Sequence, residues 1–141
     1  MVGAQGRIYP GQEATARPTI LVVEDEVLVR MCIADGLRDA GYAVIEAANA
    51  HEAMDVLGHD SVDVTLVFSD IRMAGSIDGI GLARAIRATY PIIKILLTSS
   101  HLAELRPTEH DGFIPKPYQT KEVIRHIKAL TSEENARDAD R

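Results

Sequence analysis

Cysteine is almost absent from this sequence of 141 residues, and tryptophan is absent altogether. Because Cys32 is the single cysteine, the chain can form no internal disulfide, and a zinc site built from several cysteines is excluded. We expect Cys32 to lie in a helix core, since Met31, Ile33 and Leu37 are its apolar neighbours in the sequence. The fold therefore depends on packing and hydrogen bonds rather than on covalent cross-links.

Long hydrophobic runs are also missing. No stretch comes near the roughly 18 apolar residues that a membrane helix requires. Residues 1–17 contain no hydrophobic segment like that of a signal peptide. We therefore expect a cytoplasmic protein without a membrane partner.

Positive charge is in deficit. The chain has 15 Lys and Arg residues against 21 Asp and Glu residues, which gives a formal net charge of −6. The basic residues are scattered, without the run or stripe that holds nucleic-acid phosphates. This composition predicts that the protein has no nucleic-acid partner.

The chain has the length of one domain with a hydrophobic core, and two domains would each be undersized. Residues 1–18 are rich in Gly, Gln, Ala and Pro, and we expect a flexible leader there. Residues 131–141 have no apolar residue larger than Ala, and we expect a polar tail there. The folded domain is thus expected to span residues 19–130.

Within this span, short apolar runs alternate with segments of helical periodicity. The apolar runs predict strands at residues 19–24, 43–47, 64–69, 92–98 and 112–115. The periodic segments predict helices at residues 26–40, 50–57, 80–90 and 120–130. Asn49 and Thr120 are the expected N-caps of the second and last helices, and Gly41 is expected to end the first. Because strands that alternate with helices form parallel sheets covered on both faces, we expect an α/β fold.

Polar side chains stand at the ends of four of the predicted strands, namely Glu24 and Asp25 at the first, Asp70 at the third, Thr98 at the fourth and Lys116 at the fifth. Ligands of parallel sheets collect at the carboxyl ends of the strands. Clustered carboxylates persist where a hard cation binds, and Mg²⁺ takes one or two carboxylates together with water and phosphate oxygens. A lysine opposite them suits an anion held between metal and ammonium. The combination predicts a phosphoryl site that uses Mg²⁺.

Each of these residues has a simpler interpretation when it is taken alone. Asp25 can serve as the N-cap of the first helix, and Asp70 can open a turn. Thr98 can be an ordinary strand residue, and Lys116 a solvated charge in a loop. Their joint occurrence at four strand ends is what favours the phosphoryl site.

Four segments resemble the receiver domain of two-component response regulators, and they occur in that family's order. They are ILVVEDE at Ile20–Glu26, VFSDIRMAGSIDG at Val67–Gly79, LLTSS at Leu96–Ser100 and FIPKP at Phe113–Pro117. The resemblance covers residues 19–130. It implies a flavodoxin-like, three-layer α/β/α sandwich whose five parallel strands have the order 2-1-3-4-5.

The resemblance also implies a role for each matching acidic or basic residue. Asp70 corresponds to the aspartate that takes a phosphoryl group from a phosphohistidine, and Lys116 to the lysine that contacts the phosphoryl oxygens. Asp25 and Asp70 correspond to direct Mg²⁺ ligands. Glu24 corresponds to a residue that acts on the metal through water, and the backbone carbonyl of Arg72 to a further ligand.

The remaining matches imply a switch. Thr98 corresponds to the hydroxyl that turns toward the phosphoryl group, and Phe113 to the aromatic residue that moves inward with it. The Lys116–Pro117 bond is typically cis in this family. The implied donor is a histidine kinase or a histidine phosphotransfer protein, and the implied output is a downstream protein target in a bacterial phosphorelay.

The sequence departs from the family pattern in the loop that follows Asp70. Ala74 stands where the family usually has Pro, and the loop of residues 70–79 is one residue longer than usual. This departure concerns the shape of the loop and not the acceptor.

The segment between Thr98 and Lys116 is also unusual, because only 18 positions separate the two residues. Pro107 disfavours helix at the residue before it. We therefore expect a stub or an irregular loop at residues 101–111 in place of a full fourth helix. Since one helix and a polar tail follow Lys116, we expect a stand-alone receiver without an output domain.

Three other interpretations remain open. An aspartyl-phosphate phosphohydrolase would also use Asp70 as nucleophile, but such enzymes usually have an acid or base two residues later, where this chain has Arg72. A flavodoxin-like cofactor protein would need a Thr, Ser or Gly phosphate loop after the first strand, where this chain has acids. A degenerate receiver would act only as an interaction module, although every site residue is present here. We expect a phosphorylation-dependent switch that catalyses only its own phosphoryl transfer and dephosphorylation.

Overall fold

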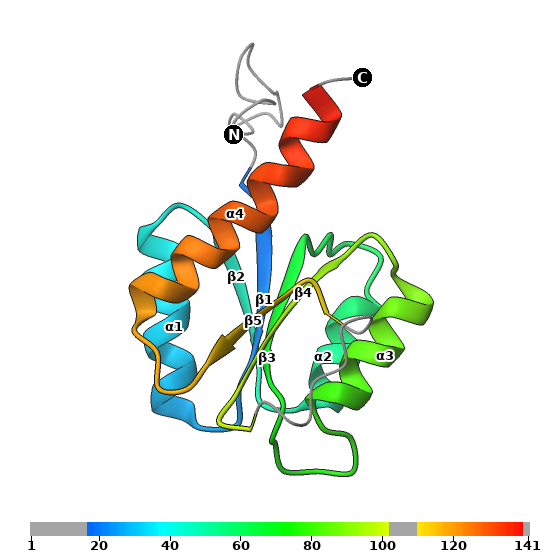
Figure 1. The fold of residues 1–141 in the computed structure, drawn as a ribbon. Coiled ribbons are helices and arrows are strands. Elements are labelled where there is room, and N and C mark those ends of the chain that lie inside the picture. The colour runs from blue at the N-terminus through cyan, green and yellow to red at the C-terminus, as the bar shows by residue number, and fades with distance from the viewer. Residues whose placement is uncertain (1–16, 102–109, 140–141) are drawn as a thin grey trace, which may run out of the picture.

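The computed structural model describes residues 17–101 and 110–139, and within them strands and helices alternate up to the fourth strand (Figure 1). The elements are β1 (Thr19–Val23), α1 (Val27–Asp39), β2 (Ala43–Ala47), α2 (Ala50–Leu57), β3 (Leu66–Asp70), α3 (Gly79–Thr89), β4 (Lys94–Ser99), β5 (Gly112–Pro115) and α4 (Thr120–Ala139). The stub or irregular loop expected at residues 101–111 falls mostly on residues 102–109, which lie outside the described residues.

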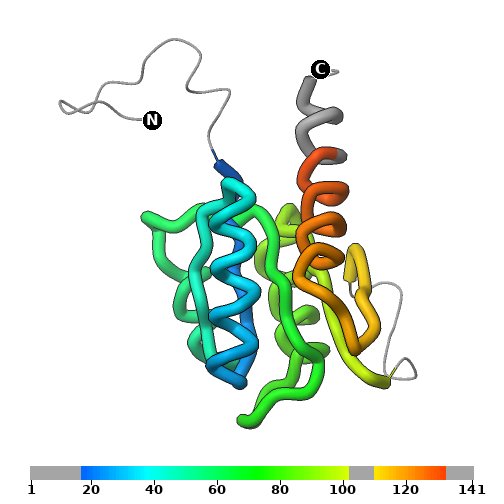
Figure 2. The backbone as a smooth tube through the Cα atoms, turned by 90° about the vertical axis from the view of Figure 1, so that its left-hand side faces the viewer, coloured from blue at the N-terminus to red at the C-terminus, as the bar shows by residue number. Residues whose placement is uncertain are grey.

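The strands form one parallel sheet in the order β2-β1-β3-β4-β5. Helices α1 and α4 cover one face, and α2 and α3 cover the other, which gives three layers (Figure 1). Viewed onto the first face, α1 and α4 stand side by side in front of the sheet (Figure 2). The expected flavodoxin-like sandwich and its strand order are therefore confirmed.

The core is divided by the sheet into two apolar clusters. Because successive side chains of a strand point to opposite faces, β1 contributes Leu21 and Val23 to the α2–α3 side and Ile20 and Val22 to the α1–α4 side. All four side chains are at most 1% exposed. The continuous apolar run at residues 19–24 is thus a central strand buried on both faces, as expected.

Local sequence signals set two of the helix boundaries. Gly41 follows the end of α1 with φ = +99°, a conformation in which a side chain would be strained. Asn49 caps α2, because its Oδ1 accepts a hydrogen bond of 2.9 Å from the backbone N–H of Glu52. In return, Glu52 Oε1 accepts one of 3.1 Å from the N–H of Ala48.

Helix α4 differs from its prediction at both ends. Thr120 is its first residue and not its cap, since the backbone carbonyl of Gln119 accepts the N–H of Glu122. The helix continues to Ala139, although residues 131–139 lack large apolar side chains. The predicted helix ended too early, at residue 130, because the Glu, Ala and Arg residues that follow favour helix although they include no large apolar residue.

The prediction for Cys32 was wrong, because its side chain is exposed. The buried residues of α1 are Ile33, Ala34 and Leu37. A helix turns by about 100° per residue, so Cys32 points away from the core and toward α4, where its Sγ lies 3.8 Å from Thr120 Oγ1.

A close approach between α3 and β3 depends on Gly79. Its N–H donates a 2.8 Å hydrogen bond to the carbonyl of Ile71. A Cβ atom on Gly79 would overlap the carbonyl oxygen of Asp70 and lie 2.7 Å from Ile71 Cα. The start of α3 can therefore reach the end of β3 only with glycine at this position.

We expect Gly79→Ala to lower the free energy of unfolding by about 1–3 kcal/mol, because backbone must shift to admit the methyl group. Gly58→Ala is the matched control, since a Cβ there meets only ordinary contacts of 3.5 and 3.6 Å. Gly58 has helical φ and ψ, so its variant should be neutral or slightly more stable. Urea unfolding measures both, and equal stabilities of the two variants would contradict the close approach.

Candidate functional site

The predicted polar residues converge at the carboxyl ends of the central strands. Asp70 is the last residue of β3, and it lies in register with Thr98 of β4. Glu24 directly follows β1, the other neighbour of β3 in the sheet. Lys116 directly follows β5, and its backbone N–H donates to the carbonyl of Ser99. The topology therefore places side chains from the carboxyl ends of four strands at one end of the sheet.

Asp70 and Lys116 form an ion pair at the centre of this edge. Lys116 Nζ lies 2.5 Å from Asp70 Oδ2, and the backbone N–H of Arg72 donates a 3.1 Å hydrogen bond to Oδ1. Asp70 is only 5% exposed. Burial alone would lower the pKa of Lys116, but its hydrogen bond to Asp70 and the charges of Asp70 and Glu24 together raise that pKa above its ordinary value. Lys116 thus stays charged beside the carboxylate.

Glu24 is the most strongly perturbed carboxyl group of the site. Its pKa is raised to about 7, chiefly by burial, with the negative charge of Asp70 and a hydrogen bond to Asp25 adding to the effect. The N–H of Glu26 and the charge of Lys116 oppose this rise. The residues Glu24–Glu26 between β1 and α1, which we call the acidic turn, therefore share one electrostatic environment with Asp70 and Lys116.

Asp25 reaches across the site and does not cap α1. The N-cap of α1 is Glu26, and no side chain makes a capping hydrogen bond there. Asp25 Oδ2 instead accepts a 3.2 Å hydrogen bond from the backbone N–H of Ala74, in the loop between β3 and α3. The simpler interpretation of Asp25 as a cap is therefore wrong, and the loop that carries Ala74 is tied to the acidic turn.

The donor set fits a hard cation that is only partly held by protein. The described ranges contain no group of three or more His, Cys, Asp and Glu side chains placed to hold a metal by themselves. Mg²⁺ needs no such group, because it usually keeps several waters and binds through one or two carboxylates plus phosphate oxygens. Asp25 and Asp70 supply two carboxylates, and both are oxygen donors of the type that Mg²⁺ prefers.

The hydroxyls of Thr98 and Ser99, the last two residues of β4, lie on opposite faces of the sheet by strand alternation. Thr98 is 1% exposed, and its Oγ1 donates a 2.7 Å hydrogen bond to the carbonyl of Ile114. Leu97 and Phe113 pair in register and pack on the α2–α3 side, whereas Ile114, the partner of Thr98, packs on the α1–α4 side. Strand alternation therefore places Thr98 and Phe113 on opposite faces of the sheet.

Ser99, which we did not single out from the sequence, lies on the same face as Phe113 by that alternation. It is 2% exposed, and its Oγ accepts a 3.0 Å hydrogen bond from the N–H of His101. Thr98 and Ser99 are adjacent in β4, so their side chains point to opposite faces of the sheet. Which of the two shares a face with Phe113 depends on the register of β4 with β5. No signal within the fourth strand alone shows that register.

The Lys116–Pro117 peptide bond is cis, as the motif implied. Tyr118 follows it, and its ring packs edge-on against Phe68 with centroids 6.0 Å apart. Burial, and then the charges of Glu24 and Asp70, raise the pKa of Tyr118 to about 12.

The sequence was compared with known families and proteins. The sequence model of a family described as the response regulator receiver domain matches residues 20–128. The sensor kinase CckA of Brucella abortus is 31% identical over 134 residues, which cover 92% of this chain and 14% of that protein. A putative NtrX-like response regulator of Rickettsia felis is 29% identical over 116 residues, which cover 77% of this chain and 24% of that protein. The chain thus spans less than a quarter of the length of these relatives.

Solved structures agree with this match. The response regulator TrrA of Thermotoga maritima, solved in complex with Mg²⁺–BeF, has a TM-score of 0.71 and 30% identity, with 80% of this chain and 98% of that chain covered. The receiver domain of the hybrid histidine kinase CckA has a TM-score of 0.69 and 33% identity, with 79% of this chain and 97% of that chain covered.

None of the helices in the described residues is long and apolar enough to cross a bilayer.

The clustered carboxylates generate a prediction for the metal-free protein. Asp25→Asn keeps an acceptor for the N–H of Ala74 but removes one negative charge beside Glu24 and Asp70. We expect it to raise the free energy of unfolding in EDTA by about 1 kcal/mol, because like charges gathered at neighbouring strand ends repel. Thermal unfolding in EDTA and in MgCl₂ measures this, and Mg²⁺ should stabilise the wild type more than the variant.

Asp60→Asn is the matched control, because Asp60 is an exposed residue in the connection that leads into the opposite end of β3. It removes the same charge and should leave both unfolding curves unchanged. A metal-free Asp25→Asn protein that is less stable than wild type would show that repulsion does not dominate this turn.

Proposed function

The chain belongs to the response regulator receiver domain family, and from this membership we propose that Asp70 accepts a phosphoryl group from a phosphohistidine and that phosphorylation switches the binding of a partner protein. The donor would be a histidine kinase or a histidine phosphotransfer protein. The observation that carries the proposal is the ion pair between Asp70 Oδ2 and Lys116 Nζ, with Asp25 reaching across the same strand ends.

The chemistry proposed is a simple displacement at phosphorus. A carboxylate oxygen of Asp70 bonds to phosphorus as the N–P bond of phosphohistidine breaks, and that electron pair returns to the imidazole nitrogen. Aspartate is a weak nucleophile, so the protein contributes mainly position and charge neutralisation. Bound Mg²⁺ would neutralise charge on the phosphoryl oxygens. Lys116 supplies the second positive charge and remains within reach of those oxygens when they replace its contact with Asp70.

An apolar groove beside Lys116 supports a protein as the donor. The groove has a volume of about 630 Å³, and its lining includes Leu28, Cys32, Lys116 and Tyr118. Leu28 is 81% exposed at the start of α1. Because Lys116 belongs both to the groove and to the Asp70 ion pair, a protein that covers the groove holds its phosphohistidine next to the acceptor.

The alternative of a phosphohydrolase has weaker support. That chemistry usually has a general acid or base two residues after the nucleophile, and this chain has Arg72 at that position. The receiver interpretation also accounts for Lys116 and for the acidic turn, which a pure interaction module would not require.

The acceptor assignment predicts the outcome of treatment with a small phosphodonor such as phosphoramidate. With Mg²⁺, the wild type should gain one phosphoryl group, visible in its intact mass, and EDTA should prevent the gain. Asp70→Asn should fold normally and gain none, because an amide does not act as the nucleophile. Asp60→Asn should be phosphorylated like the wild type. A phosphoryl group that still appears on the Asp70→Asn protein would refute the assignment.

We infer that Ser99 rather than Thr98 is the hydroxyl that responds to the phosphoryl group. Thr98 Oγ1 already donates to a buried carbonyl, and leaving it would break that hydrogen bond. Ser99 Oγ accepts a hydrogen bond from His101, so its own proton is available for a phosphoryl oxygen. Ser99 also shares its face with Phe113, the aromatic residue expected to move.

The two hydroxyls form a matched pair for an experiment. Ser99→Ala and Thr98→Ala should both be phosphorylated at Asp70. In Ser99→Ala, the change of NMR shifts around Phe113 on phosphorylation should be lost, and in Thr98→Ala it should persist. The opposite pattern would assign the role to Thr98, as the sequence motif first suggested.

A further inference from the structure

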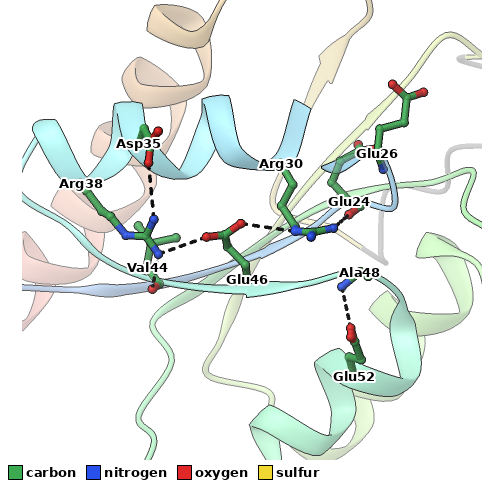
Figure 3. A network of polar contacts seen from close by, with 9 residues as sticks. All are labelled: Glu24, Glu26, Arg30, Asp35, Arg38, Val44, Glu46, Ala48 and Glu52. Carbon is green, nitrogen blue, oxygen red and sulfur yellow. Dashed lines mark hydrogen bonds and ion pairs between the residues drawn. The ribbon is translucent and has the colours of Figure 1, made fainter. Parts of the chain in front are cut away.

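Arg30, in the first turn of α1, contacts the acidic turn directly. Its Nη1 donates a 2.7 Å hydrogen bond to the backbone carbonyl of Glu24. Its Nε donates to Glu46 Oε1 on β2 at 3.3 Å (Figure 3). The Arg30 side chain is only 15% exposed. One guanidinium therefore joins the turn that carries Asp25 to the neighbouring strand.

Other described hydrogen bonds of the acidic turn are made by its side chains, as at Asp25 with the N–H of Ala74, or by the N–H of Glu24. Its Glu26 is the N-cap of α1 but makes no side-chain capping hydrogen bond. The Glu24 side chain accepts the N–H of Glu26, and the Glu24 N–H donates to the carbonyl of Ala47. The backbone carbonyl of Glu24 accepts a hydrogen bond from Arg30. Among the described contacts, Arg30 is thus the side-chain donor that holds the main chain of this turn.

Glu46 fixes the direction of Arg30. Glu46 pairs in register with Val22 of β1, so its position is set by the sheet. Its Oε1 accepts Arg30 Nε, and its Oε2 accepts Arg38 Nη2 at 3.3 Å. Arg38 in turn lies 3.6 Å from Asp35 (Figure 3). The two arginines thus share one carboxylate, but of the two only Arg30 has a hydrogen bond to the acidic turn among those described.

We propose that Arg30, oriented by Glu46, is a positioning residue for the Mg²⁺ site: by holding the Glu24 carbonyl it fixes the main chain from which Asp25 reaches toward Asp70. This inference rests on the proposed function, because it concerns the metal that phosphoryl transfer uses. It assigns no contact between Arg30 and the metal or the phosphoryl group.

The sign of the effect on Mg²⁺ affinity separates position from charge. If Arg30 acted only through its charge, removing a cation from the neighbourhood of a cation site would tighten Mg²⁺ binding. If Arg30 positions the turn, its removal weakens binding, since partners that orient metal ligands typically contribute about 10- to 100-fold to affinity.

The experiment measures Mg²⁺ binding by calorimetry for the full chain and for Arg30→Met, with Arg38→Met as the matched control. Arg38→Met also removes a positive charge from α1 and an ion pair with Glu46. It removes no described contact with Glu24. We expect the Mg²⁺ dissociation constant to rise about tenfold in Arg30→Met and to stay within about twofold in Arg38→Met. Phosphorylation of Arg30→Met by phosphoramidate should recover at saturating Mg²⁺.

A second variant, Glu46→Ala, leaves Arg30 in place without its carboxylate partner and tests the same idea should Arg30→Met fold poorly. It should weaken Mg²⁺ binding by a smaller factor, and combining it with Arg30→Met should add little, since the two residues act through one contact. The amide NMR shifts of Glu24–Glu26 should change in Arg30→Met and Glu46→Ala but not in Arg38→Met.

Unchanged or tighter Mg²⁺ binding in Arg30→Met would overturn the inference, as would equal weakening in Arg30→Met and Arg38→Met. Either result leaves the proposed function intact if the wild type binds Mg²⁺ and is phosphorylated. Failure of the wild type to do either would overturn the proposed function, and this inference with it.

Discussion

Repulsion among the carboxylates at one end of the sheet is the constraint on which the other features of the site depend. A parallel sheet brings the ends of β1 and β3 together, and with them Glu24, Asp25 and Asp70. Burial raises the pKa of Glu24, and the negative charge of Asp70 adds to this rise. Lys116 offsets the repulsion as a direct cation on Asp70, and backbone N–H groups donate to each of the three carboxylates.

The fold supplies these donors from elements that are far apart in the sequence. The loop between β3 and α3 contributes the N–H groups of Arg72 and Ala74, and its path is set by the contact of Gly79 with the end of β3. On the other side of the site, Arg30 ties the acidic turn to β2 through Glu46. The β3–α3 loop and Arg30 therefore both restrain the site, although its acidic residues repel one another.

Much of the fold could be predicted because its signals are local. Continuous apolar runs indicated the central strands, and Gly41 and Asn49 marked helix boundaries that the structure confirms. The failures have a common cause. Apolar content alone was a poor guide where it conflicted with helix propensity, as in the second half of α4, and where neighbouring apolar residues hid the direction of a side chain, as at Cys32.

By itself, the sequence determined which residue types stand at the strand ends, because an acidic turn, Asp70 and Lys116 can be read directly beside buried apolar runs. The tertiary structure alone decided which of them make contact. That Asp25 accepts from Ala74 and not from its own helix, and that Ser99 rather than Thr98 shares a face with Phe113, follow from loop path and strand register. Register shifts by one residue reverse every side chain of a strand, so such facts arise only when the strands pair.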